Sequence, residues 1–314
     1  MAGDKRRKRG ARSKRVWTLV SLAAFVVLDV GLVGLALSQG RGDADVDRNV
    51  EASAPADQTV PAPEPSSTPP RMALSAPSSY LSAVDSTTAY RAAAGSCAQA
   101  SPAILQKTID GGANWASSEI PTGLAGIVRL QAIDESYAFA VGLEATTCAA
   151  GLTATYTSGL GFQTYPDRLA SAWYLDPATP EAIHSPGGDV AAPCAAPHSL
   201  AISSDFGALV LCTDASVYET QDGGASWTAR ADASGALSIT SATTGGYKVA
   251  RVDASCAGMS VATLAEVETV APSGCNPSIP QTVTDVVISE GRDALWMQSA
   301  GRVYISEDGG LTWG

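Results

Sequence analysis

Residues 108–115 read TIDGGANW, and two near-copies of this stretch follow further along the chain. They are TQDGGASW at residues 220–227 and SEDGGLTW at residues 306–313. All three share Ser or Thr, then any residue, Asp-Gly-Gly, any residue, a small polar residue and Trp. Repetition within one chain is typical of folds built from similar units, so these segments predict a repetitive architecture.

Each copy is interpreted as a tight turn between two strands. The Asp can accept backbone N–H groups from the turn that it begins, and the glycines can adopt the positive φ angles that tight turns need. The Trp then opens the next strand and buries a large apolar face. The predicted turn residues are Asp110, Gly112, Trp115, Asp222, Gly224, Trp227, Asp308, Gly310 and Trp313.

The residues before each copy have the composition of β-strands. They read AILQK at 103–107, SVYE at 216–219 and RVYI at 302–305, with alternating polar and apolar or β-branched side chains. This alternation is typical of strands with one buried face.

The repeated segment resembles the Asp-box, or BNR repeat, with the pattern Ser-x-Asp-x-Gly-x-Thr-Trp. The third copy matches best, whereas the first has Asn114 where Ser or Thr is usual. The resemblance implies an all-β fold, a β-propeller, in which the box joins the two outer strands of a blade. Asp-boxes occur in sialidases, sortilin-type receptors, some glycoside hydrolases and photosystem II assembly factors.

The spacing of the copies sets the expected number of blades. The Trp residues are separated by 112 and 86 residues, and a four-stranded blade needs about 40–50 residues. Each gap therefore holds two blades, with one degenerate copy at Thr157–Phe162 and another near Val267–Val270. We expect about five four-stranded blades, with Ala172–His198 either an insertion or a sixth blade. A strand within Met72–Asp85 is expected to complete the last blade and close the ring.

The N-terminal part is predicted to anchor this propeller to a membrane. Residues 1–15 form a basic tail, and residues 16–38 contain the apolar run VWTLVSLAAFVVLDVGLVGLAL. At about 1.5 Å per residue this run spans a bilayer core of about 30 Å. The basic tail is expected to stay in the cytoplasm. The competing interpretation is a cleaved signal peptide, with Ala36 and Ser38 at the cleavage site, although its apolar part is long for one.

A proline-rich, disordered linker is predicted at residues 39–78, which leaves residues 79–314 as the outer domain. Seven of the 18 prolines lie in this linker, a composition that favours extended chain. We therefore expect a single-pass protein of the cell membrane whose propeller is displayed outside a bacterial cell.

The cysteines are consistent with that oxidising environment. All six follow residue 90, no Cys-x-x-C pair occurs, and only two histidines are present, so a zinc site is not expected. Fifteen disulfide pairings are possible in principle. We favour sequential pairing, which gives Cys97–Cys148, Cys194–Cys212 and Cys256–Cys275.

Charge and motifs argue against several classes of function. After residue 15 the chain has 12 basic and 30 acidic side chains, a net of −18, which disfavours nucleic acid as a partner. The box aspartates are expected to form turns rather than to catalyse, and no cofactor or metal motif is found. The Phe/Tyr-Arg-Ile-Pro segment of sialidases is absent; Tyr90-Arg91-Ala92-Ala93 is the nearest match.

The favoured function is therefore a non-catalytic binding or scaffold module for a protein, peptide or glycan. The alternative is a divergent sialidase-like or other carbohydrate-active hydrolase. That alternative would require several arginines to converge on one site; the candidates are Arg91, Arg129, Arg168, Arg230, Arg251 and Arg302.

Asp29 interrupts the apolar run, where a charge costs about 2.5–3.5 kcal/mol. One interpretation is a contact with a polar group of another membrane helix; the other is an acid that the helix tolerates. If the contact exists, we expect an Asp29→Leu chain to lose co-purification of its membrane partner. Unchanged co-purification from native membranes would contradict the contact.

Overall fold

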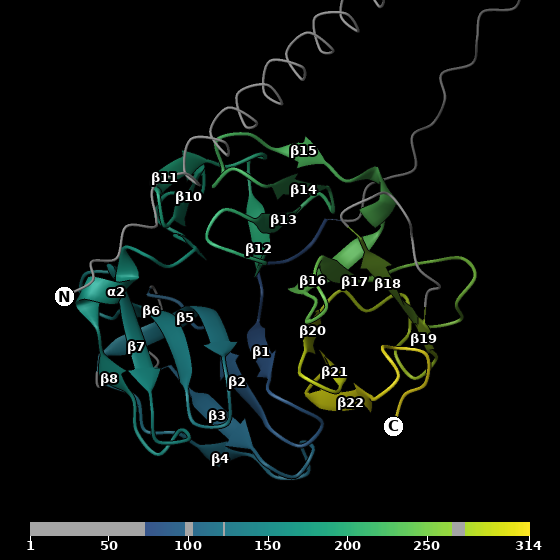
Figure 1. Ribbon diagram of the computed structural model, residues 1–314, viewed down its shortest axis with the longest axis horizontal. Helices are drawn as coiled ribbons and strands as arrows, with labels where there is room; N and C mark the ends of the chain where they lie inside the picture. Colours follow the sequence, from purple (N-terminus) through teal and green to yellow (C-terminus); the bar gives the residue numbers. More distant parts are fainter. Residues whose placement is uncertain (1–72, 98–102, 122, 266–273) are drawn as a thin grey trace, which may run out of the picture. The chain divides into compact units, whose positions relative to one another are not determined.

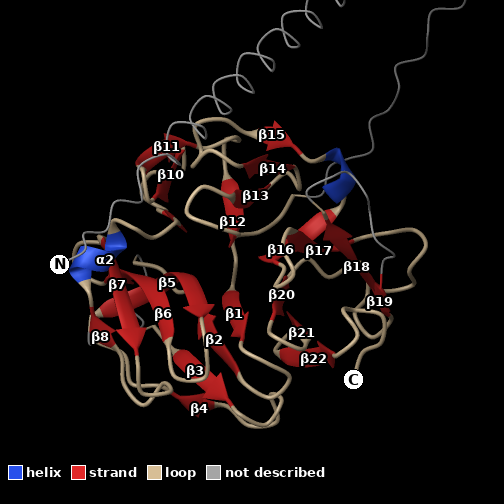
Figure 2. Cartoon of the chain, viewed as in Figure 1, coloured by secondary structure: helices blue, strands red, loops and turns tan. Residues whose placement is uncertain are grey.

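The computed structural model describes residues 73–97, 103–121, 123–265 and 274–314. These residues form six small antiparallel sheets arranged around a common centre (Figure 1). Strands dominate and helical turns are short (Figure 2). The predicted all-β propeller is confirmed, but it has six blades rather than about five.

The first three blades are successive meanders of the chain. The first contains β1 (Ser79–Ala83), β2 (Ala89–Ala93), β3 (Leu105–Thr108) and β4 (Ala116–Ser117). The second contains β5 (Leu124–Ala132), β6 (Ala138–Glu144), β7 (Ala150–Thr155) and β8 (Gln163–Thr164). The third contains β9 (Tyr174–Leu175), β10 (Ala182–Ser185) and β11 (Gly188–Ala191).

The other three blades repeat this order. The fourth contains β12 (Pro197–Ile202), β13 (Ala208–Cys212), β14 (Val217–Thr220) and β15 (Thr228–Ala229). The fifth contains β16 (Ala236–Ser241), β17 (Tyr247–Arg251), β18 (Met259–Leu264) and β19 (Gly274–Asn276). The sixth contains β20 (Val286–Glu290), β21 (Leu295–Ser299) and β22 (Arg302–Ser306). The helical turns are α2 (Pro166–Leu169) and η1 (Ala231–Ala233).

The structure decides two expectations about the ring. Residues 172–198 contain the third blade, so the alternative of a sixth blade is confirmed and the insertion is not. A strand does lie within Met72–Asp85, but it is the innermost strand of the first blade, β1, which pairs with β2 alone. Residue Gly314 instead exchanges two backbone hydrogen bonds with Ile305, at 2.9 and 3.2 Å, and so begins the outer position of the last blade.

Val16–Leu37, with Asp29, and Val267–Val270 lie outside the described residues. Among the residues that are described, no helix is both long enough and apolar enough to cross a membrane. Leu74 belongs to the stretch predicted as linker, yet its side chain is buried and its N–H donates to Thr213 O at 2.7 Å. The chain therefore contacts the propeller before β1 begins.

The six innermost strands contact one another in a closed circuit, β1, β5, β9, β12, β16, β20 and back to β1. The second strand of each blade packs behind this circuit. Its two faces both meet neighbouring blades, which is why β13 and β21 are buried along their whole length. Their sequences, ALVLC and LWMQS, lack the polar alternation of a strand with one face in water.

Hydrogen bonds cross every junction between neighbouring blades. At three junctions a serine hydroxyl of one inner strand accepts a backbone N–H of the next inner strand. Ser82 Oγ accepts Ala132 N, Ser238 Oγ accepts Ile288 N, and Ser289 Oγ accepts Ala83 N. The other three junctions are joined by Arg129 with Trp173 O, Trp173 Nε1 with Asp205 O, and Ser203 Oγ with Tyr247 OH. We call these six contacts the interblade hydrogen bonds.

The disulfide pairing is as predicted. Cys97–Cys148 joins the first blade to the second, and Cys256–Cys275 lies within the fifth. Cys194–Cys212 ties the segment between the third and fourth blades to β13.

The three Asp-Gly-Gly turns share one hydrogen-bond pattern and join the third strand of a blade to its outer edge. In each, one carboxylate oxygen accepts the backbone N–H four residues later, and the other accepts the side chain of that same residue. In the second turn, Asp222 Oδ1 lies 2.9 Å from Ser226 N, and Asp222 Oδ2 lies 2.6 Å from Ser226 Oγ. Asn114 makes the equivalent side-chain bond to Asp110 at 2.7 Å, so it replaces Ser or Thr. Assignment of these turns to the Asp-box family stays a prediction.

The turns also bring blades together. Trp227 packs among third-blade residues, and its Nε1 donates to Ala191 O at 3.1 Å. Gly224 has a φ of +91°, and a Cβ there would lie 2.5 Å from Val190 Cγ2. Glycine is therefore required both by the backbone conformation and by the close approach of the third blade.

The predicted degenerate copy has the same turn geometry. Thr155 Oγ1 accepts Gly159 N at 3.1 Å, as Thr220 Oγ1 accepts Gly224 N at 2.9 Å. Thr157 stands where the other copies have Asp, and Phe162 is buried in place of Trp. A buried apolar ring is thus retained although the charge is lost.

The only two lysines after the basic tail both cross blade junctions. Lys107 Nζ donates to Ser158 O at 3.1 Å, in the turn of the second blade. Lys248 Nζ lies 3.5 Å from Gly309 O, at the same position in the turn of the sixth blade. Lys248 is also 3.5 Å from Glu290 Oε1, in a pair whose side chains are 10% and 12% exposed.

We expect acid to destabilise the Asp-Gly-Gly turns. Hydrogen bonds from Ser226 and Thr312 lower the pKa of Asp222 and Asp308 to about 2. Because each folded pKa lies below the unfolded value of about 3.9, stability is present above pH 4 and is lost as pH falls toward 2. Melting temperatures measured from pH 5 to pH 2 should fall less for Asp222→Asn than for the natural chain. An equal fall in both would contradict this role, and exposed Glu307→Gln is the control.

We expect Lys248→Met to lower the free energy of unfolding by about 3 kcal/mol, because it leaves Glu290 nearly buried without its cation. Chemical denaturation measures the loss. The double variant Lys248→Met, Glu290→Met should recover most of it, since an apolar pair can replace a buried ion pair. Exposed Arg302→Gln should change stability by no more than about 0.5 kcal/mol. A double variant no better than the single one would refute the pairing.

Candidate functional site

A cavity of about 170 Å³ lies in the central channel and is lined by residues of all six inner strands. The strands bring hydroxyl and aliphatic side chains to its wall, together with a small number of ionisable groups. These groups are Tyr80, Arg129, Tyr174, His198 and Glu290. The convergence of six strands makes this cavity the main candidate site.

Strand irregularities place two of these groups. In β12 the pairing with β13 shifts between Pro197 and Ser199, so His198 has no partner in the ladder. In β5 the pairing with β6 shifts in the same way between Ile127 and Arg129. A β-bulge bends its strand and redirects the neighbouring side chains, and bulges are frequent beside functional sites.

His198 lies in β12, on the cavity wall. Its Nδ1 and the neighbouring Ser199 Oγ are both buried without a hydrogen-bond partner among the described residues. Burial lowers the pKa of His198, against a smaller opposing effect of Asp285, so the ring is neutral at pH 7.

Arg129 is the only arginine in the cavity wall. Its guanidinium donates to Trp173 O at 2.7 Å and to Gln131 Oε1, and it lies 5.1 Å from the centre of the Phe139 ring. Burial lowers its pKa to about 10, which leaves it charged at pH 7. No carboxylate pairs with it within the part of the chain that the structure describes.

The only acid in the cavity wall is Glu290, and its carboxylate is already engaged. One oxygen lies 3.5 Å from Lys248 Nζ, and the other accepts Thr243 N at 2.9 Å. With Glu290 paired to Lys248, Arg129 is the cavity-wall charge that has no opposite partner among the described residues.

The structure separates the six arginine candidates of the hydrolase alternative. Arg91 stacks on Trp115 at 4.1 Å, and Arg168 lies over Tyr156 and Tyr165. Arg230 pairs with Glu219 and Asp232, and Arg251 pairs with Asp253 at 3.0 Å. Arg302 is exposed on β22. Only Arg129 reaches the cavity.

The residues predicted from the repeats do not line the cavity. They lie in the Asp-Gly-Gly turns, where the carboxylates are saturated by hydrogen bonds and the Trp rings pack between blades. Across the described ranges, no group of three or more His, Cys, Asp or Glu side chains could hold a metal ion.

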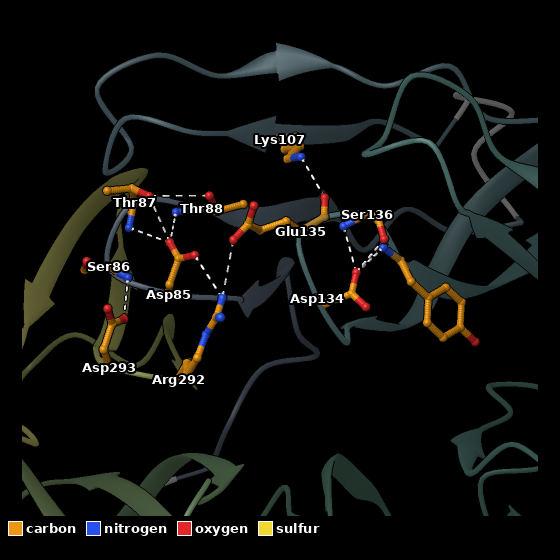
Figure 3. Close-up of polar contacts among 11 residues, drawn as sticks. Asp85, Ser86, Thr87, Thr88, Lys107, Asp134, Glu135, Ser136, Arg292 and Asp293 are labelled. Carbon is orange, nitrogen blue, oxygen red and sulfur yellow. Dashed lines mark hydrogen bonds and ion pairs between the residues drawn. The ribbon is translucent and has the colours of Figure 1, made fainter.

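A second cluster of charges lies at the inner hairpin turns of three blades (Figure 3). Arg292 of the sixth blade points between Asp85 of the first and Glu135 of the second, at 3.4 and 3.5 Å. Arg292 is 66% exposed, so these ion pairs are weak. Asp85 is also held by its own turn: burial raises its pKa, but hydrogen bonds from Thr87 and Thr88 lower it overall. In this cluster Asp85, Asp134 and Asp293 accept backbone N–H groups of the turns, whereas Glu135 is exposed.

The fold and cavity together define a six-bladed β-propeller with a narrow, lined channel. No protein-family model and no curated protein matches the sequence.

Solved structures do match, at low similarity. YCF48 bound to D1 peptide is 17% identical, over 78% of this chain and 67% of that chain, with a TM-score of 0.28. YCF48 from Cyanidioschyzon merolae is 14% identical, over 76% and 85%, with a TM-score of 0.28. The Hadza microbial sialidase Hz136 is 12% identical, over 78% and 58%, with a TM-score of 0.33. Identities and TM-scores this low assign no function to this chain.

Proposed function

We propose that this chain is a non-catalytic binding module, a propeller whose central channel receives part of a protein, peptide or glycan. The observation that carries the proposal is the cavity wall itself. It combines a charged Arg129 with the partner-free polar atoms His198 Nδ1 and Ser199 Oγ. Buried polar atoms without partners are rare in folded proteins, so an outside group is the simplest partner for them.

The proposal also includes the setting in which the propeller acts. The apolar run at residues 16–37 and the proline-rich stretch that follows it support display outside the cell membrane on a single helix. The three disulfides support an oxidising compartment. A binding surface held away from the membrane suits contact with a partner outside the cell.

The cavity wall favours binding over the alternative of glycan hydrolysis. Hydrolysis of a glycosidic bond usually needs two carboxyl groups flanking the bond. Glu290 is the only acid in the wall, and Lys248 and Thr243 occupy its carboxylate. His198 and Arg129 can position a ligand, but they do not supply the missing second acid.

We expect the double variant His198→Leu, Ser199→Ala to reduce recovery of the partner at least about fivefold, because both partner-free atoms are removed. Recovery is measured by crosslinking and co-purification of the full-length chain from native membranes. The matched control is His184→Gln, whose ring bonds to Asp189 at 2.7 Å outside the cavity.

Melting temperatures of all variants establish that they fold. Undiminished recovery with the folded double variant would contradict the channel as the binding site. Hydrolysis of a glycan by the natural chain would overturn the non-catalytic proposal.

A further inference from the structure

We propose that the channel cavity binds a small carboxylate, whose anionic group is held by the guanidinium of Arg129. The inference rests on the proposed role of the channel as a binding site and names its ligand class. It concerns a small molecule inside the cavity, so its test needs no macromolecular partner.

The charge of Arg129 has no carboxylate partner among the described residues. A buried charge is normally paired, because removal from water is costly. The partly buried Arg230 follows this rule, with a carboxylate oxygen of Asp232 at 2.8 Å. Arg129 instead contacts two neutral acceptors, Trp173 O and Gln131 Oε1. A guanidinium has five N–H donors, so three remain after these two contacts.

A ligand in the cavity could accept hydrogen bonds from the remaining N–H donors of Arg129. Arg129 belongs to the cavity wall, and Glu290, the only acid there, is held by Lys248. The described residues therefore supply no carboxylate to this guanidinium. A planar fork of N–H groups matches the two oxygens of a carboxylate, which is the geometry of the strong bidentate pair.

Another blade also brings polar atoms to the cavity wall. Arg129 comes from the second blade, whereas His198 and Ser199 come from the fourth. Their atoms Nδ1 and Oγ have no hydrogen-bond partner within the described chain. A hydroxyl can both donate and accept, so a second polar group of the ligand, or a water bridging to it, would satisfy Ser199.

The last step is size and shape. The cavity of about 170 Å³ is similar to an engineered cavity of about 150 Å³ that holds benzene. It therefore accepts a molecule of roughly six to eight heavy atoms, far smaller than an oligosaccharide. Aliphatic residues, among them Leu130, Leu200 and Ile239, share the wall with serine and threonine residues. An acid with a short carbon chain fits a small cavity of this mixed character.

The decisive test compares butyrate with butyramide, a neutral molecule of nearly the same shape. Full-length protein in detergent is titrated with each at pH 7 and constant ionic strength, and binding is followed by calorimetry and by melting temperature. We expect butyrate to bind saturably and to raise the melting temperature, and butyramide to bind at least about tenfold more weakly. Equal behaviour of the two, or no binding of butyrate, overturns the proposal.

Variants of Arg129 test whether its guanidinium holds the carboxylate. We expect Arg129→Gln to weaken butyrate binding at least about tenfold and Arg129→Lys, which keeps the charge without the fork, to weaken it less. Arg302→Gln, on an exposed residue of β22, should leave affinity unchanged. If Arg129→Gln fails to fold, the butyrate and butyramide titrations of the natural chain still decide the question.

Sulfate binding as tightly as butyrate would show a general anion site and would overturn the carboxylate class. Two further outcomes separate this inference from the proposed function. Saturable butyrate binding with no macromolecular partner recovered would support the carboxylate site while the partner proposal fails. Partner recovery with no butyrate binding would support the partner proposal and overturn the carboxylate site.

Discussion

The fold depends on the contacts between blades. A sheet of three or four short strands with two apolar faces is not stable alone, so each blade needs a neighbour on both sides. The interblade hydrogen bonds occur at all six junctions, and at three of them a serine hydroxyl accepts the N–H of the next inner strand. The same requirement explains why second strands such as β13 are buried throughout and why Gly224 cannot carry a side chain. Closing the ring also creates the channel, so the cavity is a product of blade packing rather than of any one loop.

Much of the fold could be predicted because the repeated segments act locally. Asp222 accepts two hydrogen bonds from Ser226, four positions later, so the eight consecutive residues of the segment are enough to predict the turn. About five blades were expected, with residues 172–198 left open as a sixth, because the third blade contains no such segment. A second signal existed in the inner hairpins. Asp85 and Asp134 each accept N–H groups two and three residues later, directly before a buried second strand.

The cavity could not be predicted in the same way. His198 and Arg129 reach the wall beside shifts in strand pairing, and pairing is decided by the partner strand rather than by the residues themselves. The unbalanced charge of Arg129 is likewise a property of the assembled ring. Several acids follow in the sequence, and only the fold shows that, of those the structure describes, Glu290 alone reaches the cavity wall.

The placement of Lys107 and Lys248 has a practical consequence for handling the protein. Every other lysine lies in the tail, at Lys5, Lys8 and Lys14. Both propeller lysines already donate to carbonyl groups of the next blade, and Lys248 is buried. Amine-coupling chemistry, such as attachment to a sensor chip through activated esters, will therefore react first at the N-terminal tail.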